Sequence, residues 1–259
     1  MKIYKFILSI SLLALIIVAA SCQKDEKPSV GFTMKATGAS ESPGNGTSEE
    51  PIFTTPGNPS NDVPLEFTWD QAWIYITRLE FSAHLIKPST SEIKQNPDIH
   101  MEWQGYQKVD LFGEPKLFAS LEIPDGNYQD IELSLTSARI SDMVQPNFYF
   151  AGIYGPLING IPISVSVNQE FTIHMKFENG TINAQSGNFL DGQIVVSLDN
   201  LFNGITAEDL DKAELTDGAI LISATHNQDL YLKILANLQV KPFDENTGSL
   251  AWYFHIKPN

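Results

Sequence analysis

Cys22 is the residue of this 259-residue chain that most clearly indicates chemistry. It is the only cysteine in the sequence. It follows an apolar run over 7–20 and three small residues, and Lys2 and Lys5 precede the run. A basic start, an apolar stretch and small residues at a cleavage point are typical of a secretory signal peptide. A lone cysteine has no partner for an intrachain disulfide. Cys22 is therefore a candidate for lipid attachment, behind a signal peptide predicted over 1–21.

The alternative for the same apolar run is a transmembrane anchor. A helix that spans a bilayer needs about 20 apolar residues. The run over 7–20 is shorter, and it gives way almost at once to the charged segment 23–27. The sequence therefore favours a cleaved signal peptide over a spanning anchor.

This junction resembles that of bacterial lipoprotein precursors, in which the peptide is cut before Cys22 and the cysteine is acylated, as with palmitate. Lys24-Asp25-Glu26 resembles the short Lys-acid-acid export tag of Bacteroidota-type surface lipoproteins. The resemblance implies an outer-membrane lipoprotein that faces the cell exterior, with the periplasmic face as the alternative. Acyl anchors of this kind bind through buried methylenes, at about 0.8 kcal/mol each.

The remaining polar residues form no catalytic or metal-binding pattern. The sequence contains no Gly-x-Ser-x-Gly, no His-Glu-x-x-His and no phosphate-binding glycine loop. The acids within 209–217 miss the spacing of a calcium-binding loop. The acids within 98–114 could supply a carboxylate pair for glycoside hydrolysis only if the fold places two of them at the distance that catalysis requires. The histidines lack ligand spacing: His84, His100, His174, His226 and His255. We therefore predict a non-enzymatic protein with no cofactor and no metal.

Aromatic residues give the one positive indication of a ligand. Flat rings on a sheet face can stack on sugar rings or apolar ligands, although core packing is the more usual use of such residues and the one expected for most of them. Trp103 and Tyr106 follow a polar, proline-containing segment and flank Gly105, so we expect them to border a ligand-binding surface. The full set in the first half of the chain is Trp69, Trp73, Trp103, Tyr106, Phe148, Tyr149 and Tyr154.

The charge of the chain limits its partners. Removal of 1–21 takes away two lysines and no acid, so the formal charge falls from −15 to −17. Such a surface repels nucleic-acid phosphates and anionic headgroups. Arg78 and Arg139 are the only arginines. We therefore exclude nucleic acid and expect two kinds of partner: the outer membrane through the lipid, and a glycan or a partner surface protein.

The rest of the chain divides into a tether and a β-rich domain. Residues 22–62 have the composition of a flexible tether that follows the acylated cysteine, with a strand over 30–34 as the alternative for part of it. Residues 63–259 form the predicted domain, in which alternating apolar and polar residues indicate strands. Turn signals such as Asn159-Gly160 and Asp191-Gly192 favour an antiparallel β-sandwich. The expected strands lie at 73–85, 103–110, 131–135, 148–154, 161–167, 171–177, 194–198 and 250–256.

Two short helices are expected as an insertion around 206–238. Thr206 and Asp209 have the spacing of a capping box, which predicts a helix to about residue 215. Asn227 is the expected cap of the second helix. Its apolar stripe comprises Leu230, Tyr231, Ile234, Leu235 and Leu238.

The segment 109–135 carries a further resemblance, through the motif Pro124-Asp125-Gly126-Asn127-Tyr128. It is similar to an uncharacterised domain of bacterial surface and periplasmic lipoproteins, over roughly residues 73–198. The resemblance implies an all-β sandwich of prealbumin-like or immunoglobulin-like type and no known reaction. In the motif, proline fixes the turn, glycine permits positive φ and tyrosine begins a strand.

These observations predict a cell-surface lipoprotein that acts as a non-enzymatic binding or structural module for a glycan or another extracellular ligand. Two alternatives stay open. A carbohydrate-active hydrolase would need two carboxylates at catalytic separation in a cleft. An adhesive or pilus-like subunit would need an exposed edge strand or a removable strand.

Overall fold

The structure of the chain is a computed structural model that describes residues 27–37, 65–88, 98–139, 145–177, 180–239 and 251–258. The described residues are mainly strand, as predicted. The elements are β1 (Ser29–Thr37), β2 (Phe67–Pro88), β3 (Asp98–Asp110), β4 (Ala119–Glu122), β5 (Gly126–Ser137), β6 (Phe148–Tyr154), β7 (Ile161–Val167), β8 (Phe171–Lys176), β9 (Ile182–Ala184), β10 (Phe189–Ser197), η1 (Asp199–Phe202), α2 (Ala207–Asp211), β11 (Leu215–Thr216), β12 (Ala219–Ile222), α3 (Gln228–Leu238) and β13 (Trp252–Pro258).

The strands form two sheets. The small sheet has the order β13-β10-β1-β4, and the large sheet has the order β11-β12-β7-β6-β2-β5-β8, with β3 paired to β2 and β9 paired to β5. Most neighbours are antiparallel, as the turn spacing predicts. Two pairs, β1 with β10 and β12 with β7, are parallel. Neither parallel pair is joined by a hairpin, so no turn fixes the direction of its strands.

The small sheet covers one part of the large sheet. Phe32 of β1 is fully buried, and its ring centroid lies 6.4 Å from that of Phe81 on β2. The same ring lies 6.2 Å from the ring of Phe254 on β13. Aromatic side chains of both sheets thus meet in one apolar core, as in a sandwich.

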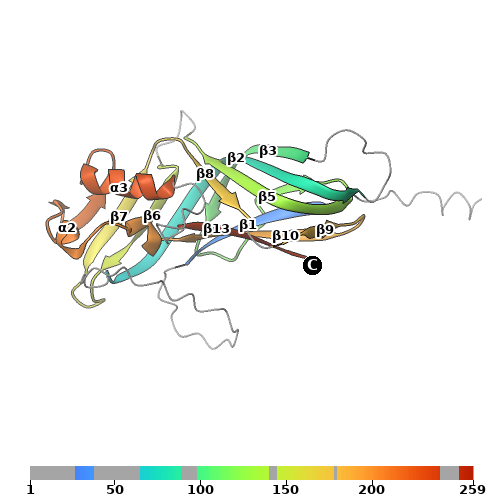
Figure 1. The fold of residues 1–259 in the computed structure, drawn as a ribbon. Coiled ribbons are helices and arrows are strands. Elements are labelled where there is room, and N and C mark those ends of the chain that lie inside the picture. The colour runs from blue at the N-terminus through green and yellow to red at the C-terminus, as the bar shows by residue number, and fades with distance from the viewer. Residues whose placement is uncertain are drawn as a thin grey trace, which may run out of the picture.

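The helices cover the other part of the same face. The ring of Phe202 in η1 lies 5.5 Å from that of Trp69 on β2 and 6.2 Å from that of Phe150 on β6. Helix α3 buries Leu230, Tyr231, Ile234 and Leu238, as its stripe predicts. Figure 1 shows α2 and α3 beside β6 and β7, and β1, β10 and β13 beside the other end of β2. We call this covered side of the large sheet its inner face.

The two helix starts lie where the sequence places them. At α2 the capping box is present: Asp209 N donates to Thr206 Oγ1 at 3.2 Å, and Thr206 N donates to Asp209 Oδ2 at 3.0 Å. Asn227 precedes α3 but makes no side-chain cap bond. Its side chain instead donates to Leu221 O at 2.8 Å and accepts from Glu214 N at 2.8 Å. Asn227 therefore connects the helix to the strands before it.

Part of the predicted tether belongs to the sandwich. Residues 29–37 form β1, which lies between β10 and β4, so the tether predicted over 22–62 does not include them. Val30, Phe32 and Met34 are fully buried, which confirms the strand alternative for this segment. The rest of the predicted tether, with Cys22, the export tag and the signal peptide, lies outside the described residues.

Two glycines differ from their predicted roles. Gly126 begins β5 without positive φ, and the motif is held by Tyr128, whose hydroxyl donates to Pro124 O at 2.6 Å. Gly192 lies within β10 and not in a turn. A Cβ there would meet the Phe32 ring at 3.0 Å, so glycine leaves room for β1. Among the described residues, no helix is long and apolar enough to cross a bilayer.

Candidate functional site

The side of the large sheet that faces away from both covers carries the candidate site. On β2, Ile74 and Ile76 point to the core and are fully buried. Because side chains alternate along a strand, Trp73 and Tyr75 point to the opposite side. We call that side the outer face.

Six residues from three parts of the chain meet on the outer face. We call them the aromatic–lysine cluster: Trp73, Tyr75, Tyr106, Lys108, Gln145 and Tyr149. The register of the sheet brings them together, since Trp73 pairs with Tyr149 on β6 and Tyr75 pairs with Lys108 on β3. Trp73, Tyr106 and Tyr149 are partly exposed, whereas Tyr75 is buried beneath its neighbours.

The rings of the cluster form two stacked pairs. The centroids of Trp73 and Tyr149 are 4.3 Å apart, with 26° between the ring planes. Those of Tyr75 and Tyr106 are 5.0 Å apart, with 14° between the planes. Burial, and after it the neighbouring Tyr75, raises the pKa of the Tyr106 hydroxyl. Both pairs therefore present stacked rings on one sheet face.

A single ammonium group lies over these rings. Lys108 Nζ is 4.2 Å from the centroid of Trp73 and 5.7 Å from that of Tyr75, within the range of cation–π contacts. Gln145 Oε1 accepts from the Tyr75 hydroxyl at 2.9 Å and from Lys108 Nζ at 3.4 Å. Trp73 Nε1 is buried and has no acceptor among the described residues.

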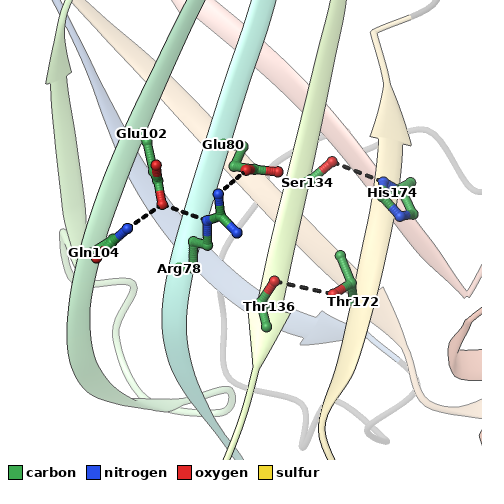
Figure 2. A network of polar contacts seen from close by, with 8 residues as sticks. All are labelled: Arg78, Glu80, Glu102, Gln104, Ser134, Thr136, Thr172 and His174. Atoms are coloured by element: carbon green, nitrogen blue, oxygen red, sulfur yellow. Dashed lines mark hydrogen bonds and ion pairs between the residues drawn. The ribbon is translucent and has the colours of Figure 1, made fainter.

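A row of polar side chains continues along the outer face, as Figure 2 shows. At its centre Arg78 of β2 contacts Glu80 through Nη2 and Glu102 of β3 through Nε, each at 2.5 Å. Gln104 also donates to Glu102, at 2.5 Å. That bond and, after it, Arg78 lower the pKa of Glu102. The two carboxylates thus neutralise the arginine.

The same row continues onto β5 and β8 as two pairs of facing residues. Ser134 Oγ is 2.8 Å from His174 Nδ1, and the Thr136 and Thr172 hydroxyls are 3.1 Å apart (Figure 2). A nucleophilic serine needs a base that a third group orients. Within the described part of the chain, no carboxylate contacts the His174 ring. The Ser134–His174 contact is therefore a cross-strand pair and not a catalytic constellation.

The structure places Trp103 and Tyr106 on opposite sides of β3. Trp103 pairs with Leu79, which is fully buried, and its ring lies edge-on to Phe118 at 6.3 Å. Tyr106 is three residues further along β3, so side-chain alternation places it on the outer face, with Gln104 and Lys108. Only Tyr106 of the two joins the cluster, so the predicted pair does not line one surface.

The other aromatic candidates divide between core and surface. Trp69 and Phe148 are buried in the core, the use that was expected for most residues of this set. Trp73 and Tyr149 join the cluster, and the Tyr154 hydroxyl donates to Asp211 at 3.3 Å. Sequence reasoning missed three members: Tyr75, Lys108 and Gln145. The alternation Trp73-Ile74-Tyr75-Ile76 was the signal that could have identified Tyr75 as outward-facing.

The charged residues considered for a metal site are spread over the fold. His84 Nδ1 lies 2.8 Å from Asp98 Oδ1, and Lys233 Nζ lies 2.9 Å from Asp209 Oδ2. Within the described ranges, no group of three or more histidine, aspartate or glutamate side chains is placed to hold a metal ion.

Comparisons of the chain with protein families, with curated proteins and with solved structures found no match.

Proposed function

We propose that the chain is a lipid-anchored, non-enzymatic binding module that recognises a glycan through the outer face of its large sheet. The observation that carries the proposal is the aromatic–lysine cluster. Core packing explains the rings of the inner face, but Trp73, Tyr106 and Tyr149 lie on the other side and remain partly exposed. Stacked rings on the surface of a sheet offer apolar faces for the C–H faces of sugar rings.

The polar row beside the cluster supports the same ligand class. Sugars present many hydroxyl groups, which bind to carboxylates, amides and hydroxyls whose positions are fixed. Arg78, Glu80, Glu102 and Gln104 hold one another in place across β2 and β3. A binding surface that is ordered before the ligand arrives loses less conformational entropy on binding.

The anchor part of the proposal rests on the sequence. Acylation of Cys22 would attach the protein to the outer membrane, with six residues between the anchor and Ser29, where β1 begins. Mass spectrometry of the mature protein tests this directly. We expect an N-terminal acylated Cys22, and a Cys22→Ala variant that retains an uncleaved N-terminus. An uncleaved, unacylated wild-type chain would contradict the anchor.

Replacement of the exposed rings tests the binding surface. Tyr106→Ala and Tyr149→Ala each remove a partly exposed ring from the cluster, and a contact with an aromatic ring contributes on the order of 1 kcal/mol. We expect binding on a glycan array to fall at least several-fold in each variant. Tyr253→Ala is the matched control, because Tyr253 is an exposed tyrosine on β13 of the small sheet. If all three variants bound glycans as strongly as the wild-type protein, the outer face would be excluded as the glycan-binding surface.

A further inference from the structure

Hydrogen-bond donors outnumber acceptors in the aromatic–lysine cluster. The ammonium of Lys108 has three N–H groups, and Gln145 Oε1 is its one hydrogen-bond acceptor among the described residues. The same oxygen already accepts from the Tyr75 hydroxyl. Trp73 Nε1 is a further donor without an acceptor in the described part of the chain. Because Trp73 Nε1 is buried, the Lys108 ammonium is the group of the two that can offer positive charge and N–H groups to a ligand.

The carboxylates nearest to the cluster along the strands are engaged elsewhere. Asp110 pairs with Trp73 in the sheet register, but its Oδ1 accepts from Phe112 N at 3.1 Å and from Gly113 N at 3.2 Å. Glu102 is bound to Arg78. No described carboxylate forms an ion pair with Lys108. Lys108 is thus a cation without a direct ion-pair partner among the described residues, in a chain of formal charge −15.

We propose that the cluster binds an acidic saccharide, a sugar with a carboxylate or sulfate ester, and that Lys108 selects the anionic group. This inference rests on the proposed glycan-binding function. The exposed rings supply contact area for the sugar. Lys108 is an exposed residue whose Nζ lies over Trp73, so its flexible side chain can turn the ammonium toward an anion. An acceptor group in the ligand would bind to the N–H groups of Lys108 that Gln145 does not use.

The acidic chain makes charge selection by Lys108 distinguishable from general attraction. Long-range repulsion between a negatively charged protein and a polyanion lowers the affinity for every acidic glycan. A preference for acidic saccharides must then come from a local contact. Salt alone is a poor test, because it screens both the long-range repulsion and the contact with Lys108. The informative comparison is one saccharide with and without its anionic group.

A glycan array with neutral, carboxylated and sulfated members tests the inference on the detergent-solubilised mature protein. We expect the strongest signals from acidic members. Calorimetry should then give at least about tenfold tighter binding for the best acidic saccharide than for its carboxyl-reduced or desulfated counterpart, as one charge-assisted hydrogen bond provides. A comparison of the carboxylated with the sulfated members of the array also shows which anionic group the protein prefers.

Variants of Lys108 assign the preference to this residue. Lys108→Met should remove the tenfold preference, and Lys108→Arg should keep most of it. Lys176→Met is the matched control, since Lys176 is an exposed lysine on β8 of the same sheet. Circular dichroism and thermal unfolding of each variant verify that the fold is intact.

The outcomes separate the two proposals. Binding of neutral saccharides only, or an acidic preference that survives in Lys108→Met, would overturn the role of Lys108 and leave the glycan-binding function standing. Failure of the array to show binding to any saccharide would overturn both.

Discussion

At the scale of single residues, Asp209 combines a helix cap with a tertiary ion pair. Its Oδ2 accepts from Thr206 N at 3.0 Å within α2 and from Lys233 Nζ of α3 at 2.9 Å. The bond to the Thr206 backbone, followed by that to Lys233, lowers the pKa of Asp209 to about 2. Asp209 therefore ties the two helices together through an ionised carboxylate.

Replacement of Asp209 should make a pH-dependent difference to stability. The folded pKa lies below the ordinary value of 3.8, so the contribution is present above about pH 4 and is lost as pH falls toward 2. We expect Asp209→Asn to lower the free energy of unfolding by about 1 kcal/mol at pH 7, a typical capping contribution. Urea unfolding of both proteins between pH 2 and 7 measures this difference.

The control for that series is Glu114→Gln, which removes one exposed carboxylate from the loop before β4. It changes the formal charge by the same amount but affects neither cap nor ion pair. If the difference between Asp209→Asn and the wild type stayed constant down to pH 2, the cap would not depend on the ionised form.

At the scale of elements, β1 decides where the folded domain begins. It lies between β10 and β4, and Phe32 connects the two sheets through ring contacts to Phe81 and Phe254. A composition that is otherwise typical of a tether surrounds this strand in the sequence. The sandwich therefore depends on a short segment close to the predicted lipid anchor.

Truncation of the Phe32 side chain tests the contribution of β1. Phe32→Ala removes a fully buried ring, and changes of this kind cost about 3–5 kcal/mol through lost burial and the cavity left behind. Such a loss is a large fraction of the stability of a typical domain. Thr33→Ala, on the other side of the same strand, should cost less than about 1 kcal/mol. Chemical denaturation of both variants measures the difference; equal, small losses would mean that β1 is not part of the stable core.

The strands and helices could largely be predicted from the sequence, because each depends on a local pattern. The period of two in 171–177 gives β8, and the spacing of Thr206 and Asp209 gives α2. The parallel direction of β1 could not be predicted, since no hairpin links it to β10. Its pairing depends on contacts between segments more than 150 residues apart in the sequence.

The candidate site could be predicted only in part, for a related reason. The sequence singled out Tyr106, Trp73 and Tyr149 as aromatic candidates, but it gave no register between their strands. Trp103 and Tyr106 are three residues apart on β3 and so point to opposite faces, but only the pairing of β3 with β2 shows that Tyr106 lies on the uncovered one. The location of Lys108 over Trp73 follows from the same register and has no local signal.

At the scale of the whole molecule, β2 is the element that both covers of the inner face share. Its first half contributes Trp69, which stacks on Phe202 beneath the helices, and its second half contributes Phe81, which meets Phe32 of the small sheet. Phe148 of β6 lies 6.2 Å from Trp252 of β13 and 5.3 Å from Phe150, which links the two regions. One continuous core therefore extends from the helical end to the small sheet.

A continuous core predicts that the helical end and the sandwich unfold together. Two variants test this, one that keeps Trp69 as its single tryptophan and one that keeps Trp252, with phenylalanine at the other three positions. Trp69 reports on the helical end and Trp252 on the small sheet. Each variant has its own stability, because Trp69 Nε1 also donates to Asp199 at 2.9 Å. The fluorescence transition of each variant is therefore compared with its own circular-dichroism transition in urea.

We expect the two transitions to coincide within each variant, as two-state unfolding requires. The physical reason is that β2 cannot lose its partners at one end without exposing the rings that the other end packs against. A tryptophan transition that preceded the loss of strand signal in either variant would divide the chain into two units. The outer face, which runs along the whole of β2, would then extend over both of them, and the order of the aromatic–lysine cluster would depend on the less stable unit.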